Sequence, residues 1–256
     1  MTAQETQDAA RAALACLDLT SLNDSDTAAD IVTLCQRALG AASPDRGPVA
    51  AVCVWPGRAA LARRLLPPHI AVAAVANFPD GSADLQRVLR DTARIVAAGA
   101  QEVDVVFPYR DFAAAPALLR AVRQACPGLR LKVILETGEL QDAALISRAC
   151  RIALDAGADF LKTSTGKTPR SATPAAAVLL LQAIAQDPDA SCRVGFKPSG
   201  GIRTVADAAL YMDLTAQHLG AEAVHPARFR IGASSLLDDI EAVLSGAHQN
   251  PASSGY

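Results

Sequence analysis

The sequence lacks the features that mark three classes of protein: an excess of basic charge, a long apolar run and a leader at the N-terminus. Its 24 Lys and Arg residues stand against 26 Asp and Glu, a formal net charge of −2, whereas nucleic-acid-binding domains carry a basic excess. No apolar run reaches the roughly 18 residues that span a bilayer. The first residues, MTAQETQDAARAAL, lack the basic-then-apolar order of a signal peptide. We therefore expect a cytoplasmic protein whose partner is neither nucleic acid nor a membrane.

Cysteine and histidine are present, but without the spacing of a disulfide framework or a metal site. The cysteines occur singly with no CxxC pair, which in a chain of 256 residues predicts reduced core residues. The histidines show no spacing typical of zinc ligands, so no metal is expected. These residues are Cys16, Cys35, Cys53, Cys126, Cys150 and Cys192, and His69, His218, His225 and His248.

Short apolar runs alternate along the chain with helical stretches rich in Ala and Leu. Eight runs have the character of strands, and they begin at Leu14, Val49, Ile70, Gln101, Leu129, Ala158, Cys192 and Arg228. The alternation predicts parallel pairing, and near-continuous apolar strands indicate a sheet covered on both faces. With 51% hydrophobic residues and the usual length of one barrel, the sequence predicts a single-domain (β/α)₈ TIM barrel over residues 1–256.

The helical pattern is clearest in DLQRVLRDTARIVAAGA, which starts at Asp84. Apolar residues recur there at helical spacing, and Gly99 provides the stop signal. The apolar residues are Leu85, Val88, Leu89, Ile95 and Val96. We also expect a short N-terminal helix and a mobile C-terminal tail over residues 246–256, which contains HQNPASSGY.

Two lysines carry the strongest chemical signal. Lys162, in DFLKTSTGKTP, lies inside an apolar strand, where a lysine is hard to accommodate unless it is paired or reactive. The structural alternative is a stem along the barrel with its ammonium in water at the rim. Lys197, in RVGFKPSGG, ends the next strand, and adjacent strands lie only about 4.8 Å apart. A neighbouring positive charge and burial both favour the neutral, nucleophilic amine.

Asp104 is the predicted acid–base partner of these lysines. It lies between valines in QEVDVVFPYR, a poor position for a carboxylate that is merely solvated. A structural ion pair with a lysine is the alternative, and it is compatible with catalysis. Asp18, in LACLDLTSLND, is a similar candidate with a less specific context.

A phosphate site is predicted after the last two strands, where barrels of this kind commonly bind phosphate. PSGGIRT follows the seventh strand, and IGASSLLDDI follows the eighth and opens a helix. Glycines let backbone N–H groups approach an anion, and serines at a helix N-terminus lie where the dipole favours phosphate. The candidate residues are Gly200, Gly201, Gly232, Ser234 and Ser235, with Lys167 as a further phosphate contact.

Together, the segments LDLT, EVDVVFPYR, KVILETGEL, GADFLKTSTGK, GFKPSGGIRT and IGASSLL resemble the 2-deoxyribose-5-phosphate aldolase family from about Leu14 to Leu237. The resemblance implies a Schiff base at Lys162, a pKa of that lysine perturbed by Lys197, and proton transfer involving Asp104. It also implies phosphate binding by the residues above. The final Tyr256 is similar to the terminal tyrosine of some family members, which suggests a catalytic contribution.

The implied reaction is reversible cleavage of 2-deoxy-D-ribose 5-phosphate to glyceraldehyde 3-phosphate and acetaldehyde, with no organic cofactor or metal. The resemblance also implies a homo-oligomer, a dimer or a tetramer. Three alternatives remain open from the residues. They are a class I aldolase or transaldolase-like enzyme for another phosphosugar, a non-catalytic phosphosugar-binding barrel, and an isomerase, which would need a Glu base and a neutral electrophile.

Overall fold

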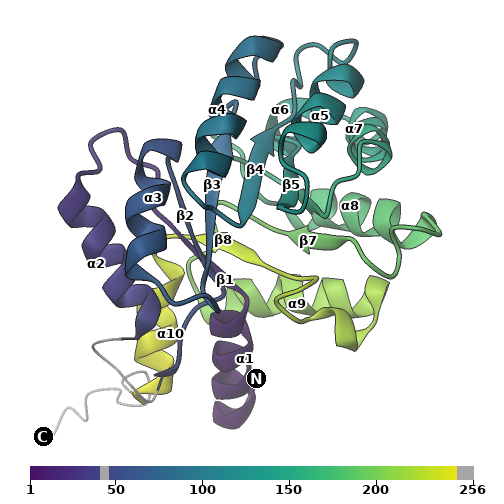
Figure 1. Cartoon of the computed structure of the whole chain (residues 1–256). Coiled ribbons are helices and arrows are strands. Elements are labelled where there is room, and N and C mark those ends of the chain that lie inside the picture. The colour runs from purple at the N-terminus through teal and green to yellow at the C-terminus, as the bar shows by residue number, and fades with distance from the viewer. Residues whose placement is uncertain (41–45, 247–256) are drawn as a thin grey trace, which may run out of the picture.

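Eight parallel strands form the centre of the molecule in the computed structural model, which describes residues 1–40 and 46–246 (Figure 1). Each strand from β1 to β7 pairs with its neighbours in chain order, and β1 also pairs with β8. The strands are β1 (Leu17–Thr20), β2 (Ala51–Val54), β3 (Ala71–Ala76), β4 (Glu102–Val106), β5 (Arg130–Ile134), β6 (Phe160–Lys162), β7 (Gly195–Lys197) and β8 (Ile231–Ala233).

The sheet closes between β7 and β8. Parallel bridges join Phe196 to Phe229 and Ser199 to Gly232. The Phe196 N–H donates to the Arg228 carbonyl at 2.8 Å, and the Arg230 N–H donates to the Phe196 carbonyl at 3.1 Å. The predicted (β/α)₈ barrel is therefore confirmed.

Helices alternate with the strands and cover the outside of the barrel (Figure 1). They are α1 (Ala3–Ala15), α2 (Ala28–Leu39), α3 (Pro56–Leu65), α4 (Leu85–Ala97), α5 (Ala115–Ala125), α6 (Thr137–Leu140), α7 (Ala143–Asp155), α8 (Pro174–Gln186), α9 (Val205–Leu219), the 3₁₀ turn η2 (Ala221–Ala223) and α10 (Leu236–Leu244). The expected N-terminal helix is α1, which begins with a capping box between Thr2 and Glu5 and packs against α9 and α10.

The predicted helix in the segment from Asp84 is α4. The Asp84 side chain accepts a hydrogen bond from the Arg87 N–H at the start of the helix, and Gly99 follows its end with φ of 71°. Val88 and Ile95 are buried, whereas Leu85 is 38% exposed. The helix predicted from this spacing is therefore confirmed, and its buried side is centred on Val88 and Ile95.

All eight predicted strands began one to three residues too early, and those from Leu14, Cys192 and Arg228 began three residues too early. Leu14 belongs to the last turn of α1, where it is buried and so resembles the start of an apolar strand. Cys192 lies in a turn before β7 and is exposed, so its assignment to the core was wrong. The other five cysteines are buried free thiols, as predicted.

In residues 1–40 and 46–246, no helix is both long and apolar enough to cross a membrane. Within the same ranges, no group of three or more His, Cys, Asp or Glu side chains is arranged to hold a metal ion.

Candidate active site

Lys162 and Lys197 are the last residues of β6 and β7, and they are directly paired in the sheet register. Alternation along each strand directs both side chains into the barrel. The Lys162 side chain is only 2% exposed and that of Lys197 is fully buried. The alternative in which the Lys162 ammonium reaches bulk water is therefore wrong.

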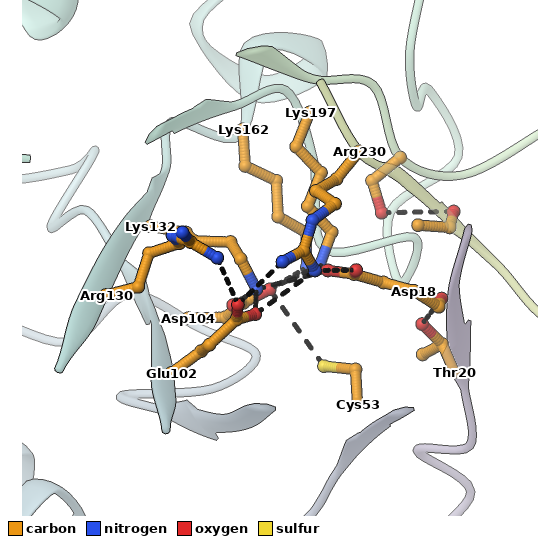
Figure 2. Close-up of polar contacts among 12 residues, drawn as sticks. Asp18, Thr20, Cys53, Glu102, Asp104, Arg130, Lys132, Lys162, Lys197 and Arg230 are labelled. Atoms are coloured by element: carbon orange, nitrogen blue, oxygen red, sulfur yellow. Dashed lines mark hydrogen bonds and ion pairs between the residues drawn. The ribbon is translucent and has the colours of Figure 1, made fainter. Parts of the chain in front are cut away.

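Asp104 joins the two lysines. Its Oδ2 atom accepts from Lys162 Nζ at 2.9 Å and from Lys197 Nζ at 2.8 Å. Figure 2 shows both lysine side chains directed toward the carboxylates of Asp104 and Asp18. Lys197 Nζ also bonds Asp18 Oδ2. The four catalytic candidates on these strands, Lys162, Lys197, Asp104 and Asp18, thus meet in one cluster.

A third lysine, Lys132 of β5, completes the cluster. It is the register partner of Asp104 and is fully buried. Its Nζ lies 2.9 Å from Asp104 Oδ1, 3.1 Å from Asp18 Oδ2 and 2.5 Å from Glu102 Oε2. Lys132 therefore contacts three carboxylates, whereas Lys162 contacts one.

Glu102 and Arg230 extend the cluster toward the N-terminal ends of the strands. Arg230 lies 2.5 Å from Asp18 Oδ1 and 2.8 Å from Glu102 Oε1. Arg130, at the start of β5, also contacts Glu102 Oε1 at 2.8 Å, but its side chain is 35% exposed. We call the seven buried members of this cluster the core network: Asp18, Glu102, Asp104, Lys132, Lys162, Lys197 and Arg230.

Burial lowers the pKa of Lys162, and the neighbouring Lys197 lowers it further, while Asp104 acts in the opposite direction. Burial would also lower the pKa of Lys197, but the Asp104 and Asp18 carboxylates raise it above its usual value. The three carboxylates that contact Lys132 likewise raise the pKa of that lysine, although burial acts to lower it. Of the three lysines, Lys162 is therefore the one whose neutral amine is favoured.

The carboxylates of the core network are held ionised. Burial would raise the pKa of Asp104, yet Lys132, Lys197 and Lys162 together place it well below the usual range. Lys132, Lys197 and Arg230 likewise lower the pKa of Asp18 against its burial. The site thus places an amine of lowered pKa beside an ionised carboxylate and a lysine of raised pKa, a set suited to covalent catalysis with proton transfer.

A pocket of about 600 Å³ lies at the C-terminal ends of the strands. The pocket is lined by all six residues that we predicted for phosphate binding: Lys167, Gly200, Gly201, Gly232, Ser234 and Ser235. Arg203 of the PSGGIRT segment lines it too. Ser235 directly precedes α10, so the orphan N–H groups of that helix lie at the pocket.

Glycines bring the pocket close to the core network. Gly200 and Gly201 have φ of 83° and 81°, the left-handed region that other residues rarely adopt. A Cβ atom on Gly232 would lie 2.5 Å from Ser199 Oγ and 3.1 Å from Lys197 Cε. Gly232 therefore lines the pocket and also leaves room for the stem of Lys197.

Comparison with known proteins agrees with this arrangement. Residues 12–242 match the family described as DeoC/LacD family aldolase. The chain belongs to this aldolase family. It is 46% identical to the deoxyribose-phosphate aldolase of Agrobacterium fabrum over 264 aligned residues, which cover 100% of this chain and 99% of the relative.

Solved structures show the same aldolase architecture. An apo-form structure from Toxoplasma gondii, assigned as a deoxyribose-phosphate aldolase, has 25% identity and a TM-score of 0.83 and covers 95% of this chain and 98% of its own. Deoxyribose phosphate aldolase from Aeropyrum pernix, described as having a unique tetrameric structure, has 26% identity and a TM-score of 0.68, with 94% of this chain and 95% of its own covered.

Sequence reasoning missed several members of the site in this aldolase. Lys132 lies inside the apolar run LRLKVILE, the same signal that singled out Lys162. Glu102 lies two residues before Asp104, so both face the barrel interior. Arg230 stands between apolar residues in RFRIGA. Each of these three residues could have been found by asking which charged residues lie in strands.

Glu136, two residues beyond the end of β5, was also missed. It adopts φ of 55°, unusual for a residue other than glycine, and its carboxylate accepts hydrogen bonds from the Thr165 hydroxyl and, at 3.3 Å, the Thr168 hydroxyl. Burial raises its pKa, and these hydrogen bonds oppose that shift. Glu136 thereby holds the loop that connects Lys162 to Lys167. The remaining candidate, Tyr256, lies outside the described residues, as do residues 247–256 of the predicted tail.

Proposed function

We propose that this aldolase cleaves 2-deoxy-D-ribose 5-phosphate reversibly to glyceraldehyde 3-phosphate and acetaldehyde, with Lys162 as the nucleophile. One observation carries the proposal: Lys162 is a buried lysine that contacts a single carboxylate and directly pairs with a second lysine. The relationship to the Agrobacterium fabrum deoxyribose-phosphate aldolase supports the choice of substrate.

In the direction of synthesis, the neutral amine of Lys162 adds to the carbonyl carbon of acetaldehyde. The adduct loses water and becomes a protonated Schiff base, which withdraws electrons from the adjacent methyl carbon. Loss of one methyl proton to a base gives an enamine, whose carbon attacks the aldehyde carbon of glyceraldehyde 3-phosphate. Water then hydrolyses the new Schiff base, which frees the sugar phosphate and restores the amine.

Asp104 and Lys197 are the proposed proton-handling groups. Asp104 Oδ2 contacts both lysine Nζ atoms, so a proton can pass between the amine, the carboxylate and a water molecule in the same small volume. Asp18 binds Lys197 and keeps it charged. We assign Asp18 a supporting role, because its contacts are with Lys197, Lys132 and Arg230 rather than with Lys162.

The 600 Å³ pocket is the proposed site of the substrate phosphate. Lys167 and Arg203 contribute positive charge, and the start of α10 contributes backbone N–H groups and the positive end of its dipole. An anchored phosphate would hold the reacting carbonyl near Lys162, which converts part of the binding energy into orientation.

Ser235→Asp tests this phosphate site. A carboxylate at the helix N-terminus would compete for its N–H groups and repel the phosphate dianion. We expect the KM for deoxyribose 5-phosphate to rise about 10-fold to 100-fold, and that for unphosphorylated deoxyribose to change little. Ser235→Asn, of similar size but uncharged, is the matched control in steady-state assays with both sugars. Equal losses for the two sugars would place the phosphate elsewhere.

Borohydride reduction tests the function itself. Incubation with acetaldehyde and borohydride should attach an ethyl group to Lys162, which mass spectrometry of a digest will locate. Dihydroxyacetone phosphate should not be trapped, and this separates the proposal from an aldolase or transaldolase-like enzyme for another phosphosugar. Modification confined to another lysine, or none, would contradict the assignment of Lys162.

We also propose a homo-oligomer, a dimer or a tetramer, on the basis of the related Aeropyrum pernix enzyme, which is described as tetrameric. Light scattering coupled to gel filtration should give a mass near twice or four times 26.5 kDa. A mass near 26.5 kDa at assay concentration would contradict it. A cytoplasmic location and the absence of nucleic-acid, metal and organic cofactor binding stay predictions from the sequence.

A further inference from the structure

When every group of the core network is ionised, its positive charges outnumber its negative charges. Each side chain of the network is 4% exposed or less. The three carboxylates (Asp18, Glu102 and Asp104) face four cations (Lys132, Lys162, Lys197 and Arg230). A net charge buried away from water is costly. The numbers become equal when one of the four cations gives up its proton.

The contacts identify which cation that is. An arginine stays protonated in proteins, which rules out Arg230. Lys132 contacts three carboxylates and Lys197 contacts two, whereas Lys162 contacts Asp104 alone. The pKa directions agree, because the pKa values of Lys132 and Lys197 are raised and that of Lys162 is lowered.

We propose that Arg230 is a positioning residue that helps to keep Lys162 neutral, because the three other cations match the three carboxylates only while Lys162 carries no charge. This inference rests on the proposed role of Lys162 as the nucleophile. Arg230 precedes β8 and lies toward the N-terminal ends of the strands, whereas Lys162 ends β6. The link between them runs through Asp18, Lys197 and Asp104.

Lys162 faces groups from four other parts of the barrel. Asp104 of β4 and Lys197 of β7 are its charged neighbours. Cys53 of β2 presents a thiol whose pKa is raised by burial, so it stays neutral. Glu136, after β5, is turned to the hydroxyls of Thr165 and Thr168, and burial raises its pKa. The charges with the largest effects on the pKa of Lys162 are Lys197 and Asp104, and both belong to the core network.

Arg230 faces a different set. It forms ion pairs with Asp18 of β1 and Glu102 of β4, and it acts on Lys132 of β5 as a like charge. Cys16, before β1, stays a neutral thiol because burial raises its pKa to about 12. The Phe160 ring lies 6.0 Å below the guanidinium. Without Arg230, the three carboxylates would face only Lys132 and Lys197 as cations. A proton on Lys162 would then make the numbers of positive and negative charges equal.

The direct test is the titration of Lys162 in Arg230→Met. The rate at which acetic anhydride acetylates the Lys162 amine, located by mass spectrometry, reports its neutral fraction at each pH. We expect the midpoint to rise by about one pH unit, the effect of one charge at roughly 10 Å through an effective dielectric constant of about 20. This measurement needs no turnover, so it remains defined even if borohydride trapping at Lys162 fails and the proposed function is wrong.

Glu102→Gln should shift the titration midpoint of Lys162 in the opposite direction. It removes a carboxylate, so the midpoint of Lys162 should move to lower pH, and the double variant Glu102→Gln/Arg230→Met should return close to the wild type. Arg130→Met is the matched control. Arg130 contacts the same Glu102 oxygen at 2.8 Å, but solvent screens its exposed side chain. We expect a much smaller shift from Arg130→Met than from Arg230→Met.

Charge matching predicts that the midpoint of Lys162 shifts in opposite directions in Arg230→Met and Glu102→Gln. A packing defect would not reverse the direction of the shift between these two variants. An unchanged midpoint in Arg230→Met, or shifts of the same sign in Arg230→Met and Glu102→Gln, would overturn the inference. If Arg230→Met does not fold, Arg230→Gln, which also removes the charge but keeps a polar side chain, takes its place in the same comparison of signs with Glu102→Gln.

Discussion

Lys162→Arg is expected to abolish aldol cleavage while the barrel stays folded. The guanidinium remains protonated at any working pH and cannot form the imine. Loss of the covalent nucleophile should lower kcat by more than about 10⁴-fold, in line with other enzymes that lose theirs. The measurement is the coupled cleavage assay with deoxyribose 5-phosphate, accompanied by borohydride trapping with acetaldehyde.

Lys162→Met is a useful companion because it removes the amine without adding a permanent charge to the core network. Both variants should show the circular dichroism of the wild type, since β6 keeps its apolar neighbours Phe160 and Leu161. Substantial turnover in either variant would show that another group forms the Schiff base. Lys197 would then be the first residue to examine, because it pairs directly with Lys162 in the sheet register and its buried Nζ lies 2.8 Å from Asp104 Oδ2.

Lys197→Leu should leave Lys162 in place and raise its pKa. Burial and the positive charge of Lys197 both lower that pKa in the wild type, and only the first remains in the variant. Activity requires the neutral amine, so the acid limb of the pH–rate profile should move to higher pH. With a shift of about two pH units, activity at neutral pH falls roughly 100-fold and partly recovers in alkaline buffer.

Lys167→Leu is the control for Lys197→Leu. Lys167 is an exposed cation that lines the phosphate pocket, so its loss should raise the KM for the phosphorylated sugar and leave the acid limb in place. A profile for Lys197→Leu that keeps its shape and merely scales down would mean that Lys197 works by another route, such as direct proton transfer.

Much of the fold follows from local patterns. Eight apolar runs separated by helical stretches predicted the eight strands, because a parallel strand buried on both faces leaves a nearly continuous apolar signal. Errors arose at boundaries, as at Leu14 and Cys192, where an apolar helix end and a turn resemble the edge of a strand. The loops that line the proposed phosphate site were also visible in sequence, since glycines and a helix start leave local signatures.

The core network shows what only the tertiary structure decided. Lys132 and Lys162 give the same sequence signal, a lysine within an apolar strand. They differ because Lys132 meets three carboxylates in the folded barrel and Lys162 meets one, so one amine keeps its proton and the other is free to lose it. The carboxylates come from β1 and β4, and the pair Asp18–Arg230 spans 212 positions of the chain. The sequence by itself pointed to Lys162 as the nucleophile, and the closure of the sheet brought together the carboxylates that distinguish it from Lys132.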